Sequence, residues 1–167
     1  MPSVLFVCTA NCFRSPLAAA FLTQALNEMG IADAWRVGSA GTWATPGQPA
    51  LPPVSQAART FGVDLSGHRS TRVSRKVLSG YDLILVMQAG HREALLTEFP
   101  EVGERLYLLS DVVERRSYDI PDSLESEEGI LEVSRELESL IRRGRDSICV
   151  LATYLYNGRH QAGAHDR

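Results

Sequence analysis

Residues 4–16 of the chain read VLFVCTANCFRSP, and this stretch decides the fold. The apolar run at its start predicts a buried strand, and the Ser-Pro pair at its end predicts the first turn of a helix, where the N–H that proline lacks is not needed. The loop between them runs from Cys8 to Arg14. Such a loop turns backbone N–H groups inward, and the helix N-terminus adds positive potential. The stretch therefore predicts an anion site suited to a phosphate group.

Two side chains of this loop, and that of the serine directly after it, are suited to catalysis. The potential that favours an anion also favours the thiolate of a cysteine at its centre, so Cys8 is the candidate nucleophile. Arg14 offers a planar fork that can bind two phosphate oxygens at once. Ser15 can donate a hydrogen bond to the thiolate. The expected substrate-binding residues of the loop are Thr9, Ala10, Asn11, Cys12 and Phe13.

Composition excludes several other kinds of protein. The chain has 167 residues, enough for one domain with a real core, and a net charge of −3 without a basic stripe, so we expect no nucleic-acid partner. No apolar run approaches the ~20 residues that span a bilayer, and the N-terminus lacks the pattern of a signal peptide. The three cysteines show no zinc spacing, so we expect no metal and no cofactor. A thiolate nucleophile needs a reducing compartment, which predicts a cytoplasmic protein.

The order of the apolar runs predicts an α/β fold. Strands are expected at 4–7, 35–37, 81–87 and 106–109, and helices at 16–29, 54–61, 91–99 and 129–144. Alternation of this kind predicts a small three-layer domain, with a four-stranded parallel sheet and helices on both faces. Ligands of such sheets bind at the carboxyl ends of strands, and Cys8 follows the first strand directly. We assign residues 1–145 to this domain and leave 146–167 as an unassigned C-terminal extension.

The chain resembles the low-molecular-weight protein tyrosine phosphatase family, whose signature is V-C-x-G-N-x-C-R-S-P. Val7, Cys8, Asn11 and residues 14–16 match it. The likeness covers residues 3–143 and continues in GSAGT at 38–42, GVDLSGHR at 62–69 and DLILVM at 82–87. The resemblance implies a phosphatase that removes phosphate from phosphotyrosine in proteins through a phosphocysteine intermediate.

Two departures from the signature lie inside the loop. Ala10 replaces a glycine, and an alanine would be strained there if the backbone needs a positive φ. Phe13 replaces the second cysteine, which here is Cys12. Cys12 lies four residues after Cys8, so it could capture the oxidised nucleophile as a disulfide. Its position carries a bulky aliphatic residue in tyrosine-specific members and a small polar one in some bacterial phosphoarginine phosphatases. Phosphoarginine in proteins is therefore the alternative substrate.

Phosphate transfer to sulfur needs a general acid for the leaving oxygen. Asp122 aligns with the aspartate of the family's Asp-Pro pair, with Ser123 in place of the proline, and Asp119 is a second candidate. A turn rich in Asp, Pro and Ser also forms without any chemical role. Leu124 and Glu125 occupy the positions of two pocket tyrosines of eukaryotic members.

Several residues outside the loop are expected to support it. In the family, the positions of Asn11, Ser39 and His68 brace the phosphate loop. Trp43 either lines the substrate pocket or anchors its own loop to the core. His91 starts a predicted helix, where we expect an exposed residue of the capping region.

Two rival functions share this fold and loop. An arsenate reductase needs two further cysteines in a central segment, and the chain has none between Cys12 and Cys149. A non-catalytic phosphate-binding module remains an alternative because of Ala10 and Ser123. The expected substrate is a phosphorylated protein, and a cognate protein kinase is a candidate partner.

Overall fold

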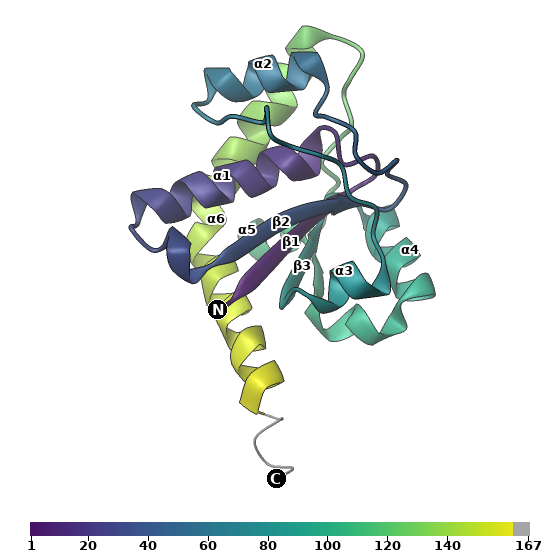
Figure 1. Ribbon diagram of the computed structural model, residues 1–167, viewed down its shortest axis with the longest axis vertical. Coiled ribbons are helices and arrows are strands. Elements are labelled where there is room, and N and C mark those ends of the chain that lie inside the picture. Colours follow the sequence, from purple (N-terminus) through teal and green to yellow (C-terminus); the bar gives the residue numbers. More distant parts are fainter. Residues whose placement is uncertain (162–167) are drawn as a thin grey trace.

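A computed structural model describes residues 1–161 of the chain (Figure 1). Its centre is a four-stranded parallel sheet, as the sequence predicts, and the strands lie in the order β2-β1-β3-β4. The strands are β1 (Ser3–Cys8), β2 (Arg36–Gly41), β3 (Leu83–Val86) and β4 (Leu106–Leu108). The helices are α1 (Arg14–Glu28), α2 (Pro52–Thr60), α3 (Arg75–Ser79), α4 (Ala89–Glu98), α5 (Leu109–Glu114) and α6 (Glu127–Gln161), with 3-10 turns η1 (Ala32–Ala34) and η2 (Pro100–Arg105).

Helices cover both faces of the sheet, so every residue of β1 is buried. Successive side chains of a strand point to opposite faces. Val4, Phe6 and Cys8 therefore pack in the layer of α1, α2 and α6, and Leu5 and Val7 pack in the layer of α3 and α4 (Figure 1). Because both faces of β1 are buried, its sequence is a continuous apolar run.

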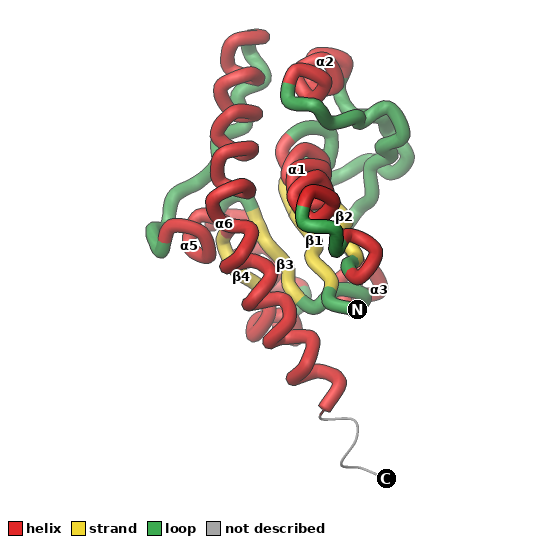
Figure 2. Tube along the Cα trace, turned by 90° about the vertical axis from the view of Figure 1, so that its left-hand side faces the viewer, coloured by secondary structure: helices red, strands yellow, loops and turns green. Residues whose placement is uncertain are grey.

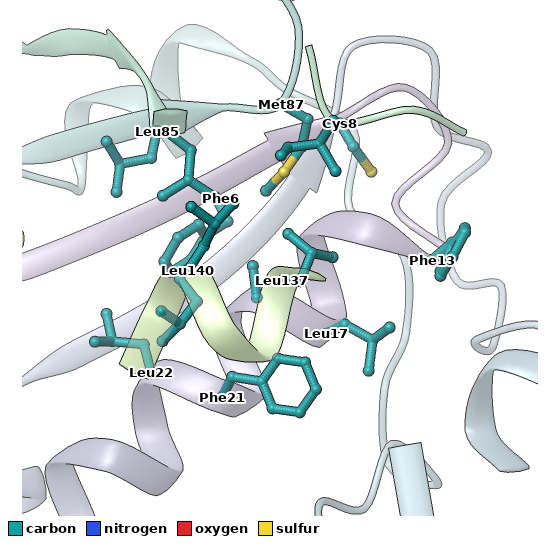
Figure 3. Packing of buried hydrophobic residues seen from close by; sticks show 14 of the residues in the cluster. Phe6, Cys8, Phe13, Leu17, Phe21, Leu22, Leu85, Met87, Leu137 and Leu140 are labelled. Atoms are coloured by element: carbon teal, nitrogen blue, oxygen red, sulfur yellow. The ribbon is translucent and has the colours of Figure 1, made fainter. Parts of the chain in front are cut away.

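The larger core lies between the sheet and the pair α1 and α6. Phe6 of β1 and Leu85 of β3 point toward Leu137 and Leu140 of α6 (Figure 3). These four side chains are fully buried. The same figure places Cys8 at the tip of β1, so the core holds the strand from which the candidate nucleophile projects.

Helix α6 is much longer than the predicted helix at 129–144, and it runs unbroken for 35 residues. Its far half extends beyond the sheet (Figure 2). Ile148 and Ala152 belong to the main core, and Arg159 makes a 2.7 Å ion pair with the buried Asp82. No break in the backbone therefore marks the predicted boundary at 145, and residues 162–167 of the predicted extension lie outside the described part. None of the helices described is long and apolar enough to span a membrane.

The carboxyl ends of β1 and β2 are held together tightly. Cys8 is in register with Gly41, and the backbone N–H groups of Thr42 and Trp43 donate to the carbonyls of Cys8 and Thr9 at 2.9 Å. A Cβ atom at Gly41 would collide with the Thr9 carbonyl, so this close approach requires glycine. The turn after β2 thereby fixes the start of the loop that follows β1.

Candidate active site

The loop at residues 9–13 joins β1 to α1 and leaves its amides free. Within the described residues, the N–H groups of Ala10, Asn11, Cys12 and Phe13 donate to no other group of the chain. Phe13 is the N-cap of α1 and makes no side-chain capping bond. The loop therefore offers several N–H donors at a helix N-terminus, which is the arrangement that binds an oxyanion.

The strain that Ala10 could have caused is absent. The positive φ of the loop falls on Asn11, at 58°, and not on Ala10. Asparagine is one of the few residues that tolerate the left-handed region, because its short polar side chain can bond locally. The backbone conformation at position 10 therefore does not require a glycine.

Cys8 is buried, and its sulfur lies against a hydroxyl group. Its Sγ atom is 2.9 Å from Oγ of Ser15. Asn11 donates from Nδ2 to the same Oγ atom at 2.8 Å, so one lone pair of Ser15 is already used. The Ser15 proton is then free for Cys8, with the carbonyl of Ala40 at 3.3 Å as the competing acceptor. A thiolate at Cys8 is the stronger acceptor, so Ser15 favours it.

The side chains expected to brace the loop meet at Asn11, which is fully buried. Its Nδ2 atom also donates to Oγ of Ser39 at 2.9 Å, and Nε2 of His68 lies 2.6 Å from its backbone carbonyl. Its Oδ1 atom accepts the Thr71 amide at 2.8 Å, a contact the sequence did not indicate. These bonds hold the one residue of the loop that carries a positive φ.

Arg14 is buried to 2% exposure beneath the loop that carries the candidate acids. Its Nη1 atom donates to the carbonyl of Ile120 at 2.8 Å. Its Nη2 atom lies 3.4 Å from Oγ1 of Thr9 and 3.7 Å from a carboxylate oxygen of Asp122. The guanidinium is thus held from both sides, which orients its remaining donors.

The two candidate acids differ in their surroundings. Asp122 lines the same cavity as Cys8, and its side chain is 44% exposed. Asp119 instead accepts the Ala89 amide at 2.8 Å, at the start of α4. Asp122 can therefore reach a group bound at Cys8, whereas Asp119 holds the loop to α4.

The cavity above Cys8 has a volume of about 130 Å³ and mostly apolar walls. It is lined by Cys8, Ala10, Cys12, Phe13, Arg14, Leu51, Asp122 and Leu124. Sequence reasoning missed Leu51, which lies in a proline-rich loop and carries no chemical signal. Trp43 is not a lining residue, and neither predicted role fits it. Its side chain is 76% exposed, and the guanidinium of Arg72 lies over its ring at 5.5 Å.

Cys12 shares the cavity with Cys8, and both are free thiols. Burial, and then the neighbouring charge of Cys8, raise the pKa of the Cys12 thiol. The raised pKa favours the protonated form of Cys12, which donates to the carbonyl of Ala10 at 3.4 Å. Within residues 1–161, no cluster of three His, Cys, Asp or Glu side chains could hold a metal ion.

The prediction of an exposed His91 is wrong, although its capping position is correct. His91 is 6% exposed and forms a capping box with Gln88. Its Nε2 atom lies 2.8 Å from Oγ1 of Thr9. Burial, and then the charge of Arg14, lower the pKa of His91 to about 4. Its proximity to the loop depends on β3 lying beside β1, which local sequence does not reveal.

Comparisons with known proteins agree with this geometry. Residues 3–148 match the family described as "Low molecular weight phosphotyrosine protein phosphatase". A "Putative low molecular weight protein-tyrosine-phosphatase" of Klebsiella pneumoniae is 34% identical, over 81% of this chain and 90% of the relative. A "Protein-arginine-phosphatase" of Geobacillus stearothermophilus is 31% identical, over 84% of this chain and 91% of the relative.

Solved structures show the same arrangement of the chain. A mutant of YwlE from Bacillus subtilis superposes with a TM-score of 0.83 at 26% identity, covering 89% of this chain and 99% of its own. The tyrosine phosphatase Wzb from Escherichia coli K30, in complex with sulphate, gives 0.79 at 29% identity, covering 89% and 99%.

Proposed function

The chain belongs to the low molecular weight phosphotyrosine protein phosphatase family, and we propose that its substrate group is phosphotyrosine in proteins. The observation that carries the proposal is the surroundings of Cys8. Its sulfur lies beside a hydroxyl and shares a cavity with Arg14, and the other walls are mostly apolar. An apolar wall suits an aromatic ring, and a buried arginine beside free amides suits a phosphate dianion.

The first chemical step transfers the phosphoryl group to sulfur. The Cys8 thiolate attacks phosphorus and forms the S–P bond while the bond from phosphorus to the tyrosine oxygen breaks. Asp122, protonated at this stage, gives its proton to the leaving oxygen. Arg14 and the loop amides stabilise the charge on the other phosphoryl oxygens.

The second step releases inorganic phosphate. The Asp122 carboxylate takes a proton from water as that water attacks phosphorus, so the acid of the first step becomes the base of the second. The S–P bond breaks, and its electron pair returns to Cys8 as a thiolate. Ser15 then donates to that thiolate, which makes Cys8 a better leaving group.

Phosphoarginine is the second candidate substrate, because of Cys12. This small side chain lines the cavity near Cys8, where a bulky aliphatic residue would narrow it. A "Protein-arginine-phosphatase" is among the relatives. Apart from Asp122, the candidate acid, the cavity wall offers no carboxylate for a basic leaving group, and Leu51 and Leu124 are apolar, which supports phosphotyrosine as the first choice.

Peptides with phosphotyrosine, phosphoarginine or phosphoserine in one sequence context would test the choice. We expect the highest kcat/KM for phosphotyrosine. Cys12→Ile should increase that preference by narrowing the cavity, and Cys12→Thr should decrease it. A wild-type preference for phosphoarginine would overturn the proposal in favour of the second candidate.

The proposed location is a reducing compartment such as the cytoplasm, because catalysis depends on a thiolate. A cognate kinase in that compartment would supply the phosphoprotein.

A further inference from the structure

His91 approaches the phosphate loop from a different part of the fold. It lies in the first turn of α4, after the strand beside β1, and it meets Thr9 across 82 positions of the chain. Its contacts also determine which ring nitrogen carries the proton. Nδ1 lies 3.1 Å from the Gln88 amide and can only accept that bond, so in the neutral ring the proton belongs to Nε2. Nε2 therefore donates to Oγ1 of Thr9.

A second donor, from Arg14, reaches the same oxygen. Nη2 of Arg14 lies 3.4 Å from Oγ1 of Thr9, while Nη1 donates to the carbonyl of Ile120. The hydroxyl of Thr9 and the carbonyl of Ile120 thus hold the two ends of the guanidinium. The orientation of Thr9 depends on His91, because Thr9 is β-branched and an anchored hydroxyl fixes its one side-chain torsion.

We propose that His91 is a positioning residue for phosphate binding: through the hydroxyl of Thr9 it fixes the direction in which Arg14 presents its remaining donors. The proposal rests on phosphoryl transfer to Cys8, and it is independent of which phosphorylated residue is the substrate. Misdirected Arg14 donors would weaken both the binding of phosphate and the stabilisation of charge in the transition state.

Charge supports the same role. Arg14 and Asp119 are the charged groups that face His91, and burial together with Arg14 keeps its ring neutral at neutral pH. A neutral ring retains the Nδ1 acceptor for Gln88 and adds no second cation beside Arg14. Both hydrogen bonds of His91 therefore persist at neutral pH.

A purely structural role, in which His91 only caps α4, is the competing explanation. Gln88 provides the matched control, because its side chain takes part in the capping box but does not contact Thr9. Gln88→Ala should lower stability with little effect on catalysis. His91→Ala removes both the cap and the bond to Thr9, and Thr9→Val removes the shared oxygen.

The experiment measures kcat and KM with p-nitrophenyl phosphate, the inhibition constant of inorganic phosphate, and the urea midpoint. We expect His91→Ala and Thr9→Val each to lose about tenfold in kcat/KM and to weaken phosphate inhibition, and the double variant to lose little more than either. His91→Gln, which can replace both bonds, should recover most of the loss. Multiplicative losses, or equal losses in Gln88→Ala and His91→Ala, would overturn the proposal.

If His91→Ala does not fold, His91→Phe, which fills a similar volume without a ring nitrogen, takes its place in the comparison with Thr9→Val and the double variant. Phosphate binding, measured by calorimetry, separates this proposal from the proposed function. A wild-type protein that binds phosphate but hydrolyses no ester would contradict the function, and the coupling of His91 to Thr9 would still be measurable in the binding constant.

Discussion

The sulfur of Cys8 lies 2.9 Å from the hydroxyl oxygen of Ser15, and Asn11 donates a hydrogen bond to the same oxygen. The Ser15 proton has two acceptors within reach, the sulfur of Cys8 and the carbonyl of Ala40, and a thiolate at Cys8 is the stronger of them. The positive φ of Asn11 places its side chain between Ser15 and Ser39. The one loop residue with a positive φ is thereby linked to the hydrogen bond at Cys8.

Cys8→Ser should abolish turnover and retain phosphate binding, because the amides of the loop remain while the nucleophile is lost. Turnover of p-nitrophenyl phosphate and calorimetric titration with phosphate would measure the two properties. The wild-type enzyme should remain active in a chelator, since the proposed steps use no metal. Full activity in Cys8→Ser, or its loss to the chelator in the wild type, would refute the mechanism.

Arg14→Lys should lose at least about a hundredfold in kcat/KM, about 2.7 kcal/mol of transition-state stabilisation. Lysine keeps the charge but not the planar fork, and it cannot span the carbonyl of Ile120 and the hydroxyl of Thr9. Steady-state kinetics with a conformational check by circular dichroism would test this. A loss below about tenfold would show that charge alone suffices.

Asp122→Asn should slow the release of poor leaving groups far more than good ones, because a phenolate of low pKa departs without a proton. Asp119→Asn should change little, since an amide oxygen can still accept the bond from Ala89. Rates measured with aryl phosphates of graded leaving-group pKa would show, for each variant, how steeply the rate depends on that pKa. The assignment is wrong if only Asp119→Asn steepens the dependence.

Peroxide should convert Cys8 to a sulfenic acid, which the Cys12 thiol then attacks to form a disulfide with release of water. The two thiols line one cavity, and the raised pKa of Cys12 should make its attack slow. Mass spectrometry should find the Cys8–Cys12 bridge, and a thiol reductant should restore activity. The Cys12→Ser control should proceed to irreversible oxidation. Sulfinic acid on Cys8 as the sole wild-type product would exclude this protection.

Acid should destabilise the wild-type protein more than His91→Gln. The pKa of His91 falls from 6.5 to about 4 on folding, so between these values the unfolded chain binds a proton that the folded chain does not. Stability is therefore retained above pH 6.5 and declines as the pH falls toward 4. Urea midpoints of both proteins at about pH 7 and about pH 4.5 would measure this difference in sensitivity to acid. Equal changes in the two proteins would contradict the direction of the shift.

The motif at residues 4–16 could be interpreted from sequence because its parts are neighbours in the chain. An apolar run, a short loop and a Ser-Pro pair determine a strand, a turn and a helix start through local forces, and Cys8 and Arg14 occupy that turn. The bracing roles of Ser39 and His68 were accessible only through resemblance to a family. That the strands run parallel could be predicted from the alternation of strands and helices along the chain.

Other features depend on which segments pack together. His91 reaches Thr9 because β3 lies beside β1, Leu51 reaches the cavity through a proline-rich loop, and the far half of α6 stays helical against the core at Ile148. Trp43 shows the converse, because its side chain remains 76% exposed and has the guanidinium of Arg72 over its ring. Local sequence determines hydrogen bonds that close within a few residues. Contacts between distant segments form only when burial of the sheet brings their ends to one edge.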